Sequence, residues 1–325
     1  MSDRLQDQRL EYTGDLHSVL QSVAHDFGFG ELESYDIVDI GYEDFNVIIQ
    51  TDGQKHFVKI FSKVRTADEI QRYVEVVKAV LTAGVRHPEL HEYQGNPIYT
   101  ESTSGLKMAV MQFVEGKTFY QDGKRTPLDE ELKQVLAQAV LIAKTPLKPV
   151  LLEDSWAIQN TGKWYEEIKD KLADTDRTLI EQALEDFQHT NYEQLPHCLV
   201  HGDLIKSNLI VGADNKIFVL DFSVANWYPR VQELAVIGAN LMNDGGALVD
   251  FETLVQKIIS MYQEQGGELT QEEIDALPGV TRLAYAAELV GSLKEEILNG
   301  NETDENKYWL QMGRIGLQKS RVKKL

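Results

Sequence analysis

The stretch HGDLIKSNLIVGADNKIFVLDF, residues 201–222, carries oxygen-bearing side chains near its ends and few polar groups along its apolar runs. Asp203 and Asn208 precede the first apolar run, and Asp221 follows the second. Two short apolar runs rich in β-branched residues, separated by a turn signal, predict a β-hairpin. The three polar side chains would then gather at the open end of that hairpin.

A two-residue turn at Asp214-Asn215 would set the pairing of this hairpin. In that register Asn208 faces Asp221 across the ladder. One amide oxygen and one carboxylate, with water and phosphate oxygens in the remaining positions, suit a hard octahedral cation such as Mg²⁺. Asp203 comes from the preceding loop, where it could lie beside the metal or accept a proton from an attacking hydroxyl.

The composition is that of a folded, acidic chain. Its 325 residues are 42% hydrophobic and 26% charged, which is enough for about two domains with real cores. The 52 acidic residues exceed the 32 basic ones and give a net charge of −20, which argues against nucleic-acid and anionic-membrane partners. The exception is a short basic tail, which we expect to be solvated: Lys319, Arg321, Lys323 and Lys324.

A single cysteine, Cys198, excludes an internal disulfide and a cysteine-rich metal site. It lies in the apolar segment HCLVHG, where we expect a buried structural thiol. The first fifteen residues are too polar for a secretion signal, and no apolar run approaches the roughly 20 residues that span a bilayer. A cytoplasmic location is therefore expected.

The pattern along the chain predicts an α+β fold with a β-rich N-terminal part and a mostly helical C-terminal part. Strands are expected at 35–40, 46–51, 55–61, 96–100 and 106–114, with a helix over 67–84. Further helices are expected at 127–144, 163–188, 247–265, 271–297 and 304–319, interrupted by the opening hairpin. We expect an N-terminal lobe at 1–115 and a C-terminal lobe at 116–325.

The first hairpin holds a cation beside a loop. Asp52-Gly53 is a strong signal for a two-residue turn, and the register that it sets places Lys59 opposite Asn46. Asn46 ends the loop GYEDFN, which begins at Gly41. A lysine on a rigid strand next to free backbone N–H groups suits phosphate binding. A structural or solvated lysine is the alternative.

Several motifs together resemble one family. VHGDLIKSN (200–208), VLDF (219–222), FVKIF (57–61) and MQFVEG (111–116) are similar to those of aminoglycoside phosphotransferases and choline kinases, which are small-molecule kinases with a bilobal, protein-kinase-like fold. The resemblance extends from about residue 15 to 318. GYEDFN, the placement of the helices and EIDALPGVTRLAYAAEL (273–289) look most similar to type II homoserine kinases.

The resemblance implies roles for particular residues. Asp203 would orient or deprotonate the acceptor hydroxyl, and Asn208 and Asp221 would hold Mg²⁺. Lys59 would contact the α- and β-phosphates of ATP, with GTP left open as the donor. The remaining nucleotide contacts would come from the phosphate loop, at Gly41 and Asn46, and from the backbone of Gln112 to Val114.

The acidic partner of Lys59 is expected on the helix that follows its strand. Glu69 lies at the edge of the apolar face formed by Ile70, Tyr73 and Val77, whereas Glu75 points nearly opposite. Glu69 is therefore the predicted partner, and a solvated surface glutamate is the alternative.

The acceptor site is expected after Asp221. Trp227, Tyr228 and Arg230 stand where the family's chain passes the acceptor, with aromatic packing as the alternative. Asn240, Asn243 and Asp244 in GANLMND could line the same pocket or cap a helix. His201 is expected to brace the loop by hydrogen bonds and not to act as the base.

Three departures from the family pattern are visible: Glu233 stands in QELA where an aspartate is usual, Lys144 follows LIA where a leucine-histidine pair is common, and the phosphate loop has only Gly41. These bear on stability or on the choice of acceptor. The preferred hypothesis is an ATP-dependent phosphotransferase acting on a hydroxyl of a small metabolite or antibiotic, with homoserine or another amino alcohol ahead of a sugar or aminoglycoside.

Two alternatives remain. A non-catalytic, regulatory nucleotide-binding protein would be favoured by loss of the lysine, aspartates or asparagine, and all are present. A metallohydrolase built on His201, Asp203 and Asp221 would need a further histidine cluster, and asparagine suits Mg²⁺ better than a softer metal.

Overall fold

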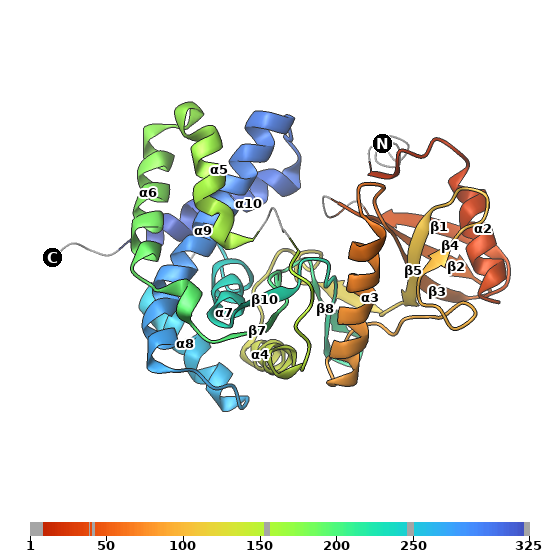
Figure 1. Cartoon of the computed structure of the whole chain (residues 1–325), viewed down its shortest axis with the longest axis horizontal. Helices are drawn as coiled ribbons and strands as arrows, with labels where there is room; N and C mark the ends of the chain where they lie inside the picture. The colour runs from red at the N-terminus through yellow and green to blue at the C-terminus, as the bar shows by residue number, and fades with distance from the viewer. Residues whose placement is uncertain (1–8, 39, 41–42, 153–156, 246–249, 322–325) are drawn as a thin grey trace. The chain divides into compact units, whose positions relative to one another are not determined.

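The computed structural model describes residues 9–38, 40, 43–152, 157–245 and 250–321. Its chain contacts divide into two compact units. Unit 1 comprises Met1–Leu81 and Arg86–Glu115, and unit 2 comprises Thr82–Val85 and Gly116–Leu325. Figure 1 shows the sheet of unit 1 in red to yellow and the helices of unit 2 mainly in green to blue. This is the mixed α/β content predicted from the sequence.

Unit 1 is built on an antiparallel five-stranded sheet with the order β1-β2-β3-β5-β4 among its described residues. The strands are β1 (Leu32–Val38), β2 (Phe45–Thr51), β3 (Gln54–Ile60), β4 (Tyr99–Thr100) and β5 (Lys107–Gln112). Asp52 and Gly53 have φ values of 40° and 76°, as a type I′ turn requires. Asn46 pairs with Lys59, so the predicted register is confirmed.

Helices accompany this sheet. Helix α2 (Leu16–Asp26) was not predicted, and its apolar side, including Leu20 and Val23, forms one core with Phe45 and Val58 of the sheet. Helix α3 (Ala67–Thr82) matches the predicted one closely. Because side chains alternate along a strand, Lys59 points away from the core that contains Val58, and its ammonium lies 5.5 Å from the centre of the Tyr73 ring on α3.

Unit 2 contains the hairpin of residues 201–222 within a three-stranded sheet of order β6-β8-β9. Its strands are β6 (Gly116–Thr118), β8 (Leu209–Gly212) and β9 (Ile217–Val219). Strands β7 (His197–Val200) and β10 (Asn226–Pro229) form a separate pair. The β7–β10 pair was not predicted.

The predicted register of this second hairpin is wrong by one residue. Leu209 pairs with Val219, and Gly212 donates its N–H to the carbonyl of Lys216, so the loop has three residues, 213–215. Asn215 has φ 59°, the left-handed conformation that closes a three-residue loop after a type I turn. Asn208 therefore accepts a backbone hydrogen bond from Leu220, the residue before Asp221.

The helices of unit 2 follow the predicted order with three differences. The helix expected at 163–188 is divided into α5 (Thr161–Ile168), the 3₁₀ turn η2 (Lys169–Lys171) and α6 (Asp174–Gln188), because Leu172 and Ala173 are extended. Helix α7 (Val231–Val236) and the π-helical turn η4 (Ile237–Leu241) were not predicted. The 3₁₀ turns η1 (Ile158–Asn160) and η3 (Tyr192–Gln194) are also additional.

The other helices are α4 (Asp129–Lys144), α8 (Phe251–Glu264), α9 (Gln271–Asn299) and α10 (Asp304–Lys319). Long α9 lies against α6, α7 and α10 (Figure 1). Of the helices in the described part of the chain, none is both long enough and apolar enough to cross a membrane.

Two histidines join the aromatic cluster of unit 1. The His56 ring stacks on Phe29 with centroids 3.6 Å apart, and His91 meets both rings edge-on. The Nε2 atoms of both histidines are buried without a hydrogen-bond partner among the described residues. Burial, followed by the charge of His91, lowers the pKa of His56 to about 4.

Unit 1 should therefore lose stability under mild acid. The unfolded chain takes up a proton on His56 near its ordinary pKa of 6.5, whereas the folded chain takes it up only near 4. Stability should fall as pH decreases from 6.5 toward 4, and His56→Phe, which keeps a stacked ring, should weaken that dependence. Urea unfolding from pH 7.5 to 4.5 measures it, with exposed His25→Phe as the control. An unchanged pH slope in His56→Phe would contradict the assignment.

Candidate active site

His201 fixes the loop that carries Asp203. Its ring is fully buried, Nε2 donates to the carbonyl of Leu220 at 2.8 Å, and Nδ1 accepts the Asp203 N–H at 3.1 Å. These partners require a neutral imidazole with its proton on Nε2, and burial lowers its pKa to about 4. The structural role predicted for His201 is confirmed. Gly202, between them, has φ 81°, which favours glycine.

Glu233, the residue that replaces a usual aspartate, lies below this loop. Its Oε2 accepts the backbone N–H of His201 at 2.5 Å, and its Oε1 is buried without a hydrogen-bond partner among the described residues. Burial raises the pKa of Glu233 to about 7, although the hydrogen bond from the His201 backbone acts in the opposite direction. Glu233 is therefore a buried anchor of the loop. Lys144, another departure from the family pattern, is the last residue of α4, and its ammonium donates to the carbonyl of Gly266.

Asp203 and Asn208 lie together. The amide Nδ2 of Asn208 donates to the Asp203 carboxylate at 2.6 Å and to its backbone carbonyl at 3.0 Å. This orientation of the amide leaves its oxygen as an acceptor. Both side chains are partly exposed, so a substrate or ion can reach them.

Asp221 follows β9 with φ 57°. Its Oδ1 accepts the Ser223 N–H at 3.2 Å and hydroxyl at 2.5 Å. The neighbouring Leu220 is hydrogen-bonded to both Asn208 and His201, which ties the Asp221 backbone to the loop. The Asp221 carboxylate and the Asn208 amide oxygen fit Mg²⁺ in donor type. Among the described residues, no group of three or more His, Cys, Asp or Glu forms a separate metal cluster.

The predicted partner of Lys59 is wrong. Its ammonium forms an ion pair with Asp44 Oδ2 at 2.9 Å, and the two side chains are 3% and 2% exposed. Arg65 binds the other oxygen of Asp44 at 2.7 Å. Glu69 instead accepts the N–H and hydroxyl of Thr66, at 2.6 and 2.9 Å, because it occupies the first turn of α3 and folds back over the helix start.

The hairpin register could have identified Asp44. Lys59 pairs with Asn46, so these two side chains lie on one face of the sheet. Asp44 precedes Asn46 by two residues and is expected on that same face, diagonally across from Lys59. The two-residue period therefore favours Asp44 over any residue of the following helix.

The other predicted nucleotide contacts all belong to unit 1. Asn46 has a buried Oδ1 without a hydrogen-bond partner among the described residues. Gln112 ends β5 and donates its N–H to the carbonyl of Glu89. No described residue hydrogen-bonds to the backbone of Val114. Gly41 lies outside the described residues.

Unit 2 places the predicted acceptor residues in different surroundings. Trp227 and Tyr228 lie on β10, with the Lys148 ammonium 5.7 Å from the Trp227 ring centre. Tyr228 accepts a hydrogen bond from Asn226. Arg230 is held by Glu273 of α9, with N–O distances of 3.0 and 2.5 Å. Because Nε and Nη2 of its guanidinium both donate to a buried carboxylate, Arg230 is an anchor of α9.

Asn240 lies within the π-helical turn η4, and Asp244 follows that turn. Asn240 is 2% exposed and accepts the backbone N–H of Lys206, whereas Asp244 is exposed. Asn243 is fully buried and donates to the carbonyl of Met312 on α10. Lys206, which was not singled out from the sequence, therefore connects this turn to the loop between Asp203 and Asn208.

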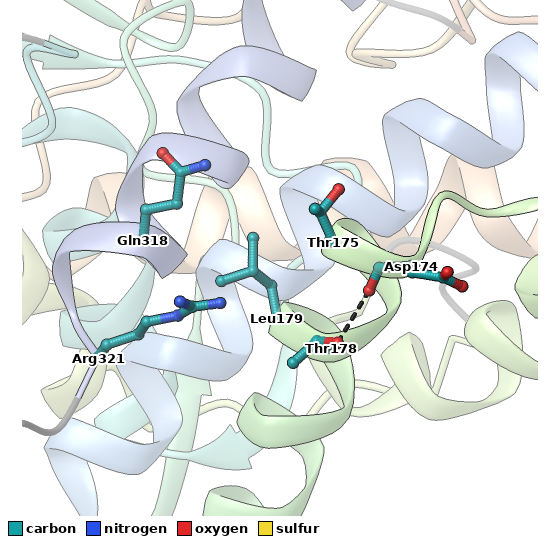
Figure 2. Close-up of a pocket in the computed structure, with 6 residues that line it drawn as sticks. All are labelled: Asp174, Thr175, Thr178, Leu179, Gln318 and Arg321. Atoms are coloured by element: carbon teal, nitrogen blue, oxygen red, sulfur yellow. Dashed lines mark hydrogen bonds between the residues drawn. The ribbon is translucent and has the colours of Figure 1, made fainter. Parts of the chain in front are cut away.

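A cavity of about 460 Å³ opens between the start of α6 and the end of α10 (Figure 2). It is lined by Asp174, Thr175, Thr178, Leu179, Gln318 and Arg321. None of the predicted catalytic, nucleotide, metal or acceptor residues borders it, so it is separate from the candidate active site. Arg321 of the basic tail reaches this rim, and Lys323 and Lys324 lie outside the described residues.

Comparison with known proteins identifies the family of this chain. The model of the phosphotransferase enzyme family matches residues 36–255. The chain belongs to the phosphotransferase enzyme family. It is a small-molecule kinase with a protein-kinase-like fold, which confirms the predicted fold class and the resemblance to aminoglycoside phosphotransferases and choline kinases.

Individual relatives of this phosphotransferase are distant. A homoserine kinase of Rhodopseudomonas palustris (strain BisB18) is 22% identical over 298 residues, covering 88% of this chain and 86% of that protein. The structure of a microcompartment-associated aminopropanol kinase has a TM-score of 0.67 at 12% identity, covering 92% and 95% of the two chains. Spectinomycin phosphotransferase with ADP and spectinomycin has a TM-score of 0.61 at 11% identity, covering 99% and 98%.

Mutation of Asp44 should lower the stability of the protein far more than mutation of Glu69. Asp44→Asn leaves the buried ammonium of Lys59 without its charged partner, and loss of one partner of a buried ion pair costs about 3–5 kcal/mol. Glu69→Gln retains the helix cap and should change stability by less than about 0.5 kcal/mol. Denaturant unfolding of both variants measures this difference. Equal stability of the two variants would argue against the Asp44 pair.

Proposed function

We propose that this chain transfers the γ-phosphoryl group of ATP to the hydroxyl of a small amino alcohol, with homoserine as the leading acceptor. The observation that carries the proposal is the Asp203 carboxylate, held by Asn208 beside the start of the hairpin that leads to Asp221. Membership of the phosphotransferase family supports the reaction class. The names of the relatives, a homoserine kinase and an aminopropanol kinase, support an amino alcohol.

In the proposed reaction Asp203 accepts the proton of the acceptor hydroxyl. The hydroxyl oxygen forms a bond to the γ-phosphorus, the bond from that phosphorus to the β–γ bridging oxygen breaks, and ADP leaves. His201 cannot serve as the base, because its Nε2 donates to Leu220 and its Nδ1 accepts from Asp203. Its contribution is to hold the Asp203 backbone in place.

Asn208 and Asp221 are proposed to hold Mg²⁺ through oxygen atoms. The Asn208 amide supports this role, because its nitrogen is directed to Asp203 and its oxygen stays available. Mg²⁺ bound there would neutralise charge on the phosphate oxygens. Asp203 then remains a hydrogen-bond acceptor for the hydroxyl, with its position fixed by the same amide.

Unit 1 is proposed to bind the nucleotide, and unit 2 to supply the catalytic and acceptor residues. Lys59 would contact the α- and β-phosphates while Asp44 keeps its ammonium oriented. Asn46 and Gly41 would contribute from the phosphate loop. The free backbone groups of Val114, next to Gln112, suit the hydrogen-bonding edge of adenine.

Asp203→Asn should reduce turnover on the order of 10²–10⁴-fold, because the amide cannot accept the hydroxyl proton. Mg-ATP should still raise the melting temperature, since the proposed phosphate and metal contacts are retained. Turnover is measured as ADP release with homoserine and other amino alcohols, sugars and aminoglycosides. Asp214→Asn, the same change at the exposed far end of the hairpin, is the control.

Three results would oppose this proposal. Unchanged turnover in Asp203→Asn would remove the catalytic role. A wild-type protein that binds nucleotide but phosphorylates none of these alcohols would favour the regulatory alternative. No melting shift with either Mg-ATP or Mg-GTP at millimolar concentration would contradict nucleotide binding itself.

The metal assignment has its own test. Asp221→Asn removes a charged ligand and should raise the Mg²⁺ concentration for half-maximal velocity by roughly tenfold or more. Mutation of residues that only hydrogen-bond to a metal ligand already lowers metal affinity by about 10–100-fold. The hydrogen bonds from Ser223 can persist with asparagine, so the local backbone is preserved. Initial velocities are measured at fixed ATP over a Mg²⁺ series. The same Mg²⁺ dependence in the variant and in Asp214→Asn would rule out Asp221 as a ligand.

A further inference from the structure

A hydrogen-bonded chain runs from the catalytic loop to helix α9. Lys206, between Asp203 and Asn208, is 0% exposed, and its ammonium donates to the carbonyl of Asn243 and the hydroxyl of Tyr308. Its backbone N–H donates to Asn240 Oδ1 at 3.2 Å. Asn240 Nδ2 then donates to Glu288 Oε1 at 2.7 Å. All members of the chain belong to unit 2, so their mutual placement is given by the structure.

Glu288 is a carboxylate with unused hydrogen-bonding capacity. Its only hydrogen bond within the described part of the chain comes from Asn240, which leaves Oε2 without a partner. The residue is partly exposed, so a small molecule can reach it. Burial raises its pKa to about 7, although Asn240 and Lys206 act to lower it. A largely desolvated carboxylate that accepts only one hydrogen bond favours a cationic ligand group that donates N–H groups.

Charges of both signs lie around Tyr308 and Glu288. The Lys206 ammonium donates to the Tyr308 hydroxyl, the Lys124 ammonium lies 4.4 Å from the centre of the Tyr308 ring, and Asp244 and Glu288 act electrostatically on Lys206. Tyr308 stays neutral because burial raises the pKa of its hydroxyl. A ligand group at Glu288 Oε2 meets the carboxylate first, which attracts a cation and repels an anion.

We propose that Glu288 binds the ammonium group of the acceptor through Oε2, and that Asn240 and Lys206 position Glu288 relative to the loop of Asp203. The site would take a small alcohol with an ammonium group. This inference rests on the proposed function, because it assigns the part of the acceptor that does not react.

The residues around Tyr308 favour a ligand ammonium that carries N–H groups over a quaternary ammonium. Tyr120 and Tyr308 meet edge to face at 5.6 Å, and their faces could attract a cation. The ammonium of Lys124 already occupies that position, 4.8 Å from the Tyr120 centre and 4.4 Å from the Tyr308 centre. A trimethylammonium group has no N–H to offer Glu288, so choline should be a poor acceptor.

The test compares Glu288→Gln with the wild-type chain in Mg-ATP-dependent phosphorylation. The acceptors are homoserine, 3-amino-1-propanol, choline and 4-hydroxybutanoate, which lacks the amine. The variant should raise KM for homoserine and 3-amino-1-propanol by about 10–100-fold, the range of a charge-assisted hydrogen bond. The KM for ATP and the weak activity with 4-hydroxybutanoate should not change. Glu296→Gln, at an exposed position of the same helix, should behave as wild type.

A purely structural role for Glu288 gives a different result. In that case Glu288→Gln would lower kcat for every acceptor alike, amine or not, because the loop would be misplaced. That result, or an unchanged KM for the amino alcohols, overturns the inference while the proposed kinase function stands. A wild-type chain that is active only on alcohols without an amine overturns the inference together with the amino-alcohol assignment.

The wild-type chain alone provides a second measurement in case the variant does not fold. Its kcat/KM for homoserine should exceed that for 4-hydroxybutanoate by at least about tenfold, and 3-amino-1-propanol should exceed choline by a similar factor. Equal kcat/KM values within either pair would overturn recognition of the ammonium group.

Discussion

The candidate active site depends on one buried, neutral imidazole. His201 receives the N–H of Asp203 on one nitrogen and donates to Leu220 with the other, so it joins the catalytic loop to the strand that leads into Asp221. Glu233 holds the backbone of the same histidine from below. A protonated ring would have to give up the Asp203 contact, because both nitrogens would then be donors. The low pKa of His201 therefore preserves the geometry as well as reflecting burial.

The two hairpins show what local sequence can and cannot specify. Asp52-Gly53 permits positive φ at both turn positions, so the register of Lys59 followed from two residues. Asp214-Asn215 allows a two-residue or a three-residue loop, and the left-handed conformation of Asn215 selects the longer one. The fold class followed from β-rich and helical patterns, whereas α2, the β7–β10 pair and the break at Leu172 depend on tertiary packing.

The candidate site also contains residues that the sequence identified and residues that it missed. Asp203, Asn208 and Asp221 lie within one short stretch, and the motif that they form identifies them. The partner of Lys59 was assigned from a helix that usually supplies it, and the contact with Asp44 shows that cross-strand geometry was the better guide. Lys206, Asn240 and Glu288 are distant in sequence and are connected by hydrogen bonds that no spacing rule reveals.

The anchoring of Lys206 also limits how the C-terminal helices can vary. Its ammonium reaches the carbonyl of Asn243 and the hydroxyl of Tyr308 on α10, so three distant segments share one buried positive charge. A chimera that took α10 from a relative without a hydroxyl at the position of Tyr308 would leave the buried ammonium of Lys206 with fewer hydrogen-bond acceptors. When acceptor specificity is exchanged between members of this family, residue 206, the turn at Asn243 and α10 should therefore be exchanged together.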